Sequence, residues 1–213
     1  MKTDDLVNML ATGGGTMTAT AIGRRYATSI GWGMLGAILL MLVLLRTRHD
    51  LVQATSLPMF WIKLAFSGAL AGGSLFATMR LSRPGARLEW LPLAVFLPVL
   101  TIWTIATYSY FDAEPVERSK LLFGETWKIC PLLIAMLSIP VFVAVIRAMR
   151  DLAPTRPRLA GFTAGLLSGA IAAVVYCLHC PEMGAPFIGV WYLLGILIPA
   201  CIGALLGSAL LRW

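Results

Sequence analysis

Charged residues are scarce in this chain, and acidic residues are the scarcest. Only 13% of its 213 residues are charged, against roughly 25% in soluble domains, whereas 59% are hydrophobic. The mean hydropathy is +0.83. This composition excludes a soluble protein and predicts one that resides in a membrane.

Acidic side chains are absent from the six longest apolar runs, each close to the roughly 20 residues that cross a bilayer as a helix. These runs cover residues 27–45, 59–79, 91–111, 129–146, 159–178 and 187–211. Proton-coupled transporters need an ionisable group inside the membrane, and membrane enzymes need a cluster of acids, bases or nucleophiles there. We therefore expect no enzyme and no cofactor, and a small transporter or efflux protein is kept only as an alternative.

Lys63 is the only charged side chain inside an apolar run. It lies about one turn inside the second run, beside Phe60 and Trp61, where aromatic belts form at the membrane surface. A lysine there commonly extends along the apolar surface and places its ammonium in water. The sequence therefore predicts that Lys63 snorkels.

The distribution of Lys and Arg between the runs predicts an orientation. Eleven of the 17 lie on the side of the two termini and five on the opposite side, and basic residues accumulate on the cytoplasmic side. The predicted fold is an all-α membrane protein, a six-helix transmembrane bundle over residues 27–213 in a bacterial inner membrane, with both termini cytoplasmic. The basic loops suit contact with the lipid bilayer, and no basic surface for direct nucleic-acid binding is present.

Residues 1–26 form the only substantial polar segment outside a loop, and we expect them to form a separate cytoplasmic unit. The segment opens with two acids in the first turn of a short amphipathic helix and apolar residues at helical spacing. These residues are Asp4, Asp5, Leu6, Val7 and Leu10. A helix of about two turns is unstable alone in water, and a Gly- and Thr-rich tether follows it as far as Ile22. Such a segment is typical of one that folds on a partner.

Two of the four cysteines lie near helix ends on the periplasmic side, where disulfides form. Cys130 is at the start of the fourth run and Cys180 follows the fifth, so they can meet if these two helices are neighbours. Pro131 predicts that Cys130 caps its helix, where the helix dipole and Lys128 would stabilise a thiolate. Cys201, within the last run, is most simply a small core residue.

The residues alone leave three interpretations of Cys130 and Cys180 open. They can form a structural disulfide, respond to oxidants or thiophilic metals, or bind a metal with His179 and Glu182, although that spacing matches no standard zinc pattern. Cys177 and Cys180 also form a C-x-x-C motif. It would suit a membrane thiol-disulfide oxidoreductase, but no thioredoxin-like pattern surrounds it.

Glycine pairs spaced four residues apart indicate where helices approach closely. They are Gly68 with Gly72, Gly161 with Gly165 and Gly169, and Gly203 with Gly207. Packing within one chain is the simpler interpretation, and a homodimer formed through one such face is the alternative.

Several short motifs occur in a recognisable order along the chain. They are M-K-T-D-D-L at 1–6, F-W-x-K at 60–63, R-P-G at 83–85, A-P-T-R-P at 153–157, L-H-C-P-E at 178–182, W-Y at 191–192 and L-R-W at 211–213. Together with the six-run plan, they resemble the NrsF family of bacterial inner-membrane anti-sigma factors along essentially the whole chain.

The resemblance implies a function that composition does not show. Members of the family hold an extracytoplasmic-function sigma factor inactive at the membrane, so the N-terminal helix would bind the sigma factor. Cys130 and Cys180 match two periplasmic cysteines needed for the stress response, whereas Cys177 is not part of the family pattern. The implied protein releases its sigma factor when these cysteines sense oxidants or thiophilic metals.

Overall fold

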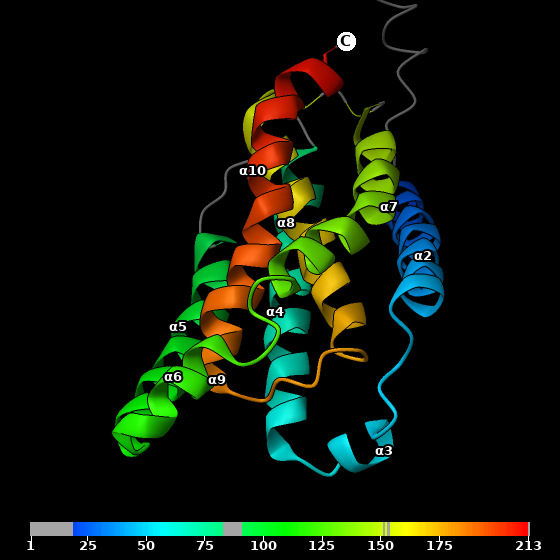
Figure 1. Cartoon of the computed structure of the whole chain (residues 1–213). Helices are drawn as coiled ribbons and strands as arrows, with labels where there is room; N and C mark the ends of the chain where they lie inside the picture. The colour runs from blue at the N-terminus through cyan, green and yellow to red at the C-terminus, as the bar shows by residue number, and fades with distance from the viewer. Residues whose placement is uncertain (1–18, 83–90, 151, 153, 213) are drawn as a thin grey trace, which may run out of the picture.

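The computed structural model describes residues 19–82, 91–150, 152 and 154–212, and these form helices and turns with no β-strand among them. Six helical stretches are long and apolar enough to cross a membrane (Figure 1), as the sequence predicted. They are α2 (Ala19–Leu44), α4 (Pro58–Leu81), α5 (Leu91–Asp112), α7 (Cys130–Arg150), α8 (Pro157–Tyr176) and a last stretch made of α9 (Ala185–Phe187), the π-helix η1 (Ile188–Tyr192) and α10 (Leu193–Leu210). Two short helices that the sequence did not predict, α3 (Leu51–Ala54) and α6 (Pro115–Phe123), lie in connections.

Proline marks the start of several of these helices. Pro58, Pro115, Pro157 and Pro186 each occupy the first or second helical position. A proline there loses no hydrogen bond and already has a helical φ. Three further prolines lie inside α5, α7 and α10, where neighbouring helices compensate for the missing bond.

Helix α8 forms the centre of the bundle. It packs against α10, α4 and α7, and nearly all of its side chains are buried. Helix α2 packs mainly on α7, and α5 packs on α4 at the opposite side with most of its residues exposed (Figure 1). The chain therefore wraps one fully buried helix in helices that are buried on one face only.

The contact between α8 and α10 depends on glycine. A Cβ atom at Gly161 would lie 2.0 Å from the carbonyl oxygen of Gly203, and one at Gly165 would lie 2.1 Å from that of Pro199. These separations are far below van der Waals contact, so the two backbones touch directly. The two glycine sets on these helices thus pack within the chain, as expected.

The glycine pair on α4 behaves differently from the prediction. A Cβ atom at Gly68 or Gly72 would meet nothing within 4 Å. Spacing shows that two glycines share a face of α4, but that face is not the one that packs on α8. The expectation that Gly68 and Gly72 mark a tight helix contact within the chain is therefore wrong.

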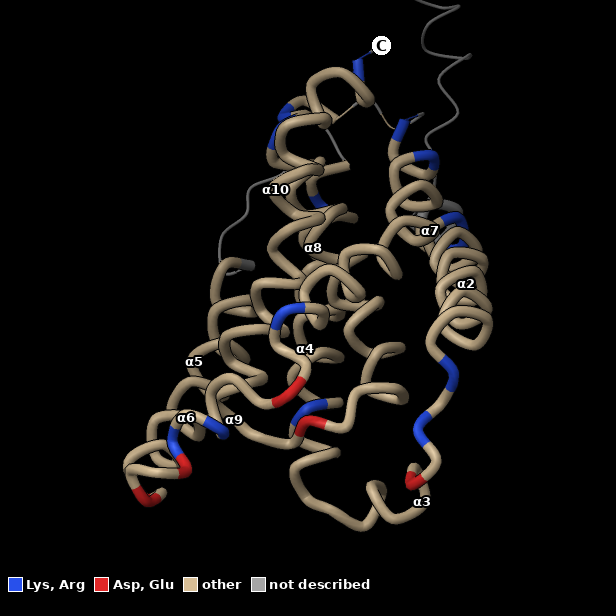
Figure 2. The backbone as a smooth tube through the Cα atoms, in the orientation of Figure 1, with Lys and Arg blue, Asp and Glu red and all other residues tan. Residues whose placement is uncertain are grey.

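Charge separates the two ends of the bundle (Figure 2). All six acidic residues within the described ranges lie at one end, which we call the acidic end. Asp112 is the last residue of α5, and the other five lie in the connections α2–α4, α5–α7 and α8–α9. The opposite end, called the basic end, comprises the start of α2 and the ends of α4, α7 and α10. The charged residues described there are all arginines. The sequence predicted such an asymmetry, because most Lys and Arg residues lie on the side of the two termini.

The start of α2 differs from the predicted boundary. The helix begins at Ala19, so the last residues of the predicted tether, up to Ile22, are helical. The predicted helix at Asp4–Leu10 lies outside the described residues. The division of the chain at residue 26 therefore stays a prediction.

We predict that Gly165→Ala lowers stability by about 1–3 kcal/mol, because the added methyl group must push α8 from the α10 backbone. The thermal midpoint of unfolding in detergent micelles measures this effect. Gly68→Ala is the matched control and should leave the midpoint unchanged or slightly higher, since its Cβ enters open space. Equal midpoints for the two variants would contradict the packing described here.

Candidate functional site: a buried cysteine cluster at the acidic end

The turn after α8 places two cysteines inside the bundle. The backbone N–H groups of His179 and Cys180 both donate to the carbonyl oxygen of Tyr176 at 3.0 Å, so the chain closes tightly after the last helical turn. Pro181 then stops any helical continuation, because it lacks an N–H and restricts the residue before it. The chain runs without regular structure to Gly184 before α9 begins.

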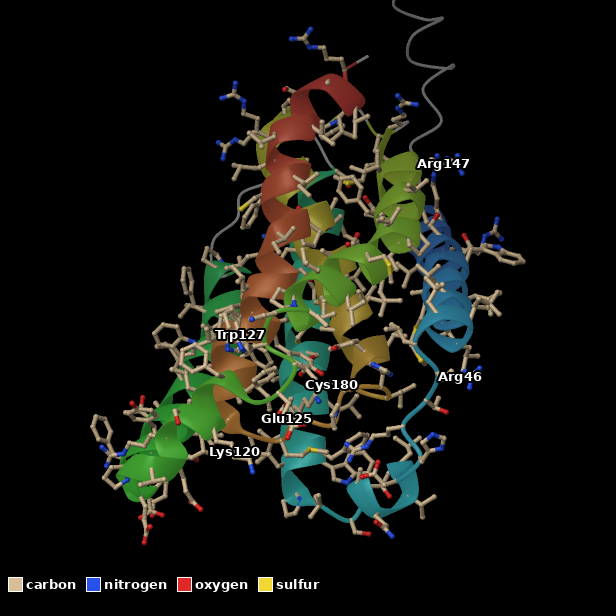
Figure 3. All side chains as sticks on the ribbon, viewed as in Figure 1. Arg46, Lys120, Glu125, Trp127, Arg147 and Cys180 are labelled. Atoms are coloured by element: carbon tan, nitrogen blue, oxygen red, sulfur yellow. The ribbon has the colours of Figure 1, made fainter. Side chains whose placement is uncertain are left out.

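Cys130 and Cys180 meet in this turn. Helices α7 and α8 are neighbours, and the side chains of the two cysteines are hydrogen-bonded to each other. Both are fully buried free thiols, and Figure 3 shows Cys180 in the interior near the acidic end. Cys130 is the first residue of α7 rather than its cap, with Pro131 in the first turn as expected. The structure therefore brings together the two cysteines that the family resemblance singles out.

The remaining cysteines face other surroundings. Cys177 is also buried, and it faces Ser67 of α4 rather than Cys130. Cys201 lies on the exposed surface of α10. The expectation that Cys201 is a core residue is therefore wrong, because the buried face of α10 is the one that carries Gly203 and Gly207.

Lys63 does not snorkel. Its side chain has no exposed surface, and its ammonium donates to the carbonyl oxygens of Cys180 and Glu182, each at 3.1 Å. The ammonium also lies 4.7 Å from the centre of the Tyr192 ring, a distance at which a cation is attracted to the ring face. Lys63 thus points into the bundle, because two backbone carbonyls of the cysteine turn provide the polar partners that water would otherwise supply.

Aromatic rings close the inner wall of the cluster. The Tyr176 and Tyr192 ring centres are 5.7 Å apart, and Phe187 packs on Tyr192 at 6.5 Å. The Tyr192 hydroxyl is fully buried and has no conventional hydrogen-bond partner among the described residues, although it faces the Cys180 sulfur. A buried hydroxyl without a partner is costly, which makes this group a notable feature of the site.

Glu182 ties the cysteine turn to the start of α7. Its Oε1 accepts from the backbone N–H groups of Glu125 at 2.7 Å and Thr126 at 3.2 Å, and from the Thr126 hydroxyl at 3.3 Å. Gly124 precedes them with a φ of 53°, and a Cβ there would collide with the Glu182 carboxylate. The carboxylate therefore acts as a latch between two connections that are far apart in the sequence.

The same turn holds the end of α2. His179 Nδ1 donates to the carbonyl oxygen of Arg46 at 2.8 Å, and the Arg48 backbone N–H donates to that of Leu178 at 3.3 Å. The Arg48 guanidinium donates to the Cys180 carbonyl oxygen at 3.5 Å. The connection that follows α2 is thus fastened to the cysteine turn by three hydrogen bonds, and Figure 3 shows Arg46 just beyond that helix.

These contacts bear on the interpretation of the cluster as a metal site. His179 and Glu182 both direct their side chains to backbone groups, away from the two sulfur atoms. Within the described ranges, no three His, Cys, Asp or Glu side chains are grouped so that they could hold a metal ion. The geometry instead favours chemistry between two sulfur atoms.

The two cysteines of the turn differ in acidity. The hydrogen bond from the Cys130 thiol, together with the nearby Lys63 ammonium, lowers the pKa of Cys180 to about 5 despite its burial. Burial raises the pKa of Cys177 to about 11. These surroundings favour the thiolate form, which is the reactive form of cysteine, at Cys180 rather than at Cys177.

Sequence reasoning missed the roles of Lys63, Tyr192 and Glu182. A lone charge within an apolar run is unusual, so the sequence marked Lys63 as a residue of interest. Its neighbours Phe60 and Trp61, however, predicted a side chain directed to the membrane surface. Glu182 was a candidate metal ligand and Tyr192 belonged to a family motif, but neither position indicated its contacts, because these lie far away in the sequence. Comparison with known proteins then places this cluster in a biological context.

The family of proteins described as negative regulator of sigma F matches residues 10–213, and the chain belongs to this family. A protein of Azospira oryzae named probable anti-sigma-F factor NrsF is 66% identical over 213 residues and covers both chains completely. The anti-sigma-F factor NrsF of Caulobacter vibrioides is 42% identical over 216 residues, again covering both chains completely. No solved structure matches the chain.

We predict that Glu182→Ala destabilises the acidic end by about 1.5–3 kcal/mol, because it leaves two backbone N–H groups without their charged acceptor. Amide hydrogen exchange of residues 121–130 measures the effect, and exchange there should accelerate. Glu117→Ala removes an exposed carboxylate from the neighbouring helix α6 and serves as the control. Unchanged exchange in Glu182→Ala would show that the latch is not needed.

Proposed function

We propose that this chain is a membrane-bound anti-sigma factor whose N-terminal segment sequesters an extracytoplasmic-function sigma factor. Both curated relatives are named as anti-sigma-F factors and match over their full length. The proposal assigns the chain a regulatory role without catalysis of its own. The sigma factor would meet the residues Asp4, Asp5, Leu6, Val7 and Leu10, which lie outside the described part of the chain.

We infer that the basic end faces the cytoplasm and the acidic end the periplasm of the inner membrane. The charge separation of the bundle supports this orientation, since arginine accumulates on the cytoplasmic side of membrane proteins. The N-terminal segment would then be cytoplasmic, because α2 begins at the basic end. The Cys130 and Cys180 pair would be periplasmic, in an oxidising compartment where thiol chemistry can be read as a signal.

The single observation that carries the proposal is the course of α2. This helix continues the N-terminal segment at the basic end, and its other end is fastened to the turn that contains Cys180. A change at the cysteine pair therefore acts directly on the helix that carries the sigma-binding segment. No relay through several helices is required, because α2 spans the whole distance.

Helix α2 is also attached to the rest of the bundle at the basic end. The Tyr26 hydroxyl is hydrogen-bonded to Ser82 just after α4, and the Arg25 guanidinium donates to the carbonyl oxygen of Arg147 on α7. Oxidant or a thiophilic metal ion acting on Cys130 and Cys180 would shift the balance between two arrangements of α2 in the bundle. One arrangement holds the sigma factor, and the other releases it.

We predict that Leu6→Asp and Leu10→Asp each weaken sigma-factor binding about 100-fold or more, because each buries a carboxylate in an apolar contact. Co-purification of the full-length protein with its sigma factor and a reporter of sigma-dependent transcription measure the effect. Asn8→Asp adds the same charge between them and is the control. Unchanged binding and repression in both leucine variants would refute sequestration by this segment.

We predict that Cys130→Ser and Cys180→Ser each keep repression and lose induction by a thiol oxidant or a thiophilic metal ion, because one sulfur alone cannot form the bridge. The transcription reporter measures both properties. Cys201→Ser is the control and should respond as the unchanged protein does, since Cys201 lies far along α10 on an exposed surface. Normal induction in both cysteine variants would remove this pair from the mechanism.

A further inference from the structure

Lys63 is a buried cation without a carboxylate partner. None of the described Asp or Glu side chains lies within ion-pairing distance of its ammonium, whose hydrogen bonds go to the carbonyl oxygens of Cys180 and Glu182. Carbonyl dipoles and the Tyr192 ring stabilise the charge in part, but a fully buried charge generally has an opposite charge beside it. The acidic groups that surround this ammonium are thiols.

Cys180 is the thiol best placed to carry the negative charge. Its carbonyl oxygen accepts a hydrogen bond from the Lys63 ammonium, and its fully buried side chain lies beside that of Cys130. The Tyr192 hydroxyl also faces this sulfur and has no conventional partner among the described residues. A cluster of donors around one sulfur is suited to an anion, because a neutral thiol is a weak acceptor.

We propose that the Lys63 ammonium and the Cys180 thiolate form an ion pair in the reduced protein, which makes Cys180 the sulfur that reacts first and Cys130 the thiol that completes the disulfide. Lys63 is then a positioning residue of the sensor. This part of the assignment stands on the geometry of the buried cluster alone. Its consequence for signalling rests on the proposed function.

The chemistry of a hydroperoxide at this pair follows from the assignment. The Cys180 thiolate attacks the distal oxygen, so an S–O bond forms while the O–O bond breaks, and hydroxide or alkoxide leaves. The Cys130 thiol then attacks the sulfur of the resulting sulfenic acid, forming the S–S bond and releasing water. Two electrons pass from the two sulfurs to the peroxide. The proton of Cys130 leaves in the released water, and the hydroxide or alkoxide of the first step takes a proton from solvent.

Disulfide formation removes the negative charge that faces Lys63. The ammonium then keeps only the Tyr192 ring and its carbonyl partners, which belong to the turn that binds the connection after α2. A buried cation that loses its counter-ion favours any rearrangement that hydrates it. If the proposed function is right, this loss of charge is the event that loosens the cysteine turn from α2.

The infrared S–H stretching band of the purified full-length protein in detergent tests the ion pair, since a thiolate has no S–H bond. We expect the band of the unchanged protein and that of Cys180→Ser to have equal intensity at neutral pH, because Cys180 contributes nothing to it. In a Lys63→Met background, the same Cys180→Ser change should lower the band by the intensity of one S–H group, because Cys180 would then be a neutral thiol. Lys63→Arg keeps the cation and should behave like the unchanged protein.

The first comparison needs no variant of Lys63, so it holds even where Lys63→Met fails to fold. Loss of one S–H oscillator on Cys180→Ser in the unchanged background would show a neutral Cys180 and overturn the ion pair. The Cys180→Ser change could leave the S–H band intensity unchanged both with Lys63 and in the Lys63→Met background. Cys180 would then be a thiolate without Lys63, which would overturn the role of Lys63. The role of Lys63 is supported if Cys180→Ser lowers the S–H band intensity in the Lys63→Met background but not in the Lys63→Arg background.

The transcription reporter separates this inference from the proposed function. Lys63→Met should reduce induction by hydroperoxide at least tenfold while it keeps repression, and Lys63→Arg should restore induction. Normal induction in Lys63→Met would overturn the order of reaction. An ionised Cys180 in a protein whose Cys130→Ser and Cys180→Ser variants are induced normally would instead support the ion pair and refute the sensor.

Discussion

The burial of the Lys63 ammonium is the constraint on which the acidic end of the bundle depends. An ammonium inside an apolar bundle needs polar partners, and the carbonyl oxygens of Cys180 and Glu182 supply them at 3.1 Å. Meeting this need fixes the path of the turn after α8. That path sets Cys180 against Cys130 and directs the Glu182 carboxylate to the start of α7. The buried ammonium, both sulfurs and the latch thus belong to one connected cluster.

The close packing of α8 on α10 gives this arrangement a rigid base. Backbones that touch at Gly161 and Gly165 leave no room for one helix to slide on the other. Helix α2 is held differently, by hydrogen bonds at its two ends and by one face on α7. Motion in response to a change at the cysteines is therefore expected in α2, and this is the helix that leads to the N-terminal segment. The stable core and the movable arm are separate parts of one bundle.

The chain belongs to the family of negative regulators of sigma F, and its buried cluster holds two free thiols beside each other. The cluster joins two cysteines, a lysine and a tyrosine, and the side chains of all four are fully buried. Such a site suits a reagent as small as a peroxide or a metal ion. The same burial that restricts access also strengthens the effect of each charge, since water cannot screen it. In the proposed ion pair, a change in the charge of Cys180 therefore acts strongly on Lys63.

Much of the plan was determined by the sequence alone. Six apolar runs determined the helices, and the parity of the connections placed Cys130 and Cys180 at the same end, because each span reverses the side of the chain. What only the tertiary structure decided is which face of each helix is buried. Lys63 points inward, Cys201 points outward, and a Cβ atom at Gly68 would meet nothing within 4 Å among the described residues, although hydropathy does not distinguish inward from outward positions. The physical reason is that hydropathy measures the preference of a residue for an apolar medium, and the bilayer and the interior of the bundle are both apolar. Only contacts between helices that are far apart in the sequence decide whether a residue faces the bilayer or the interior of the bundle.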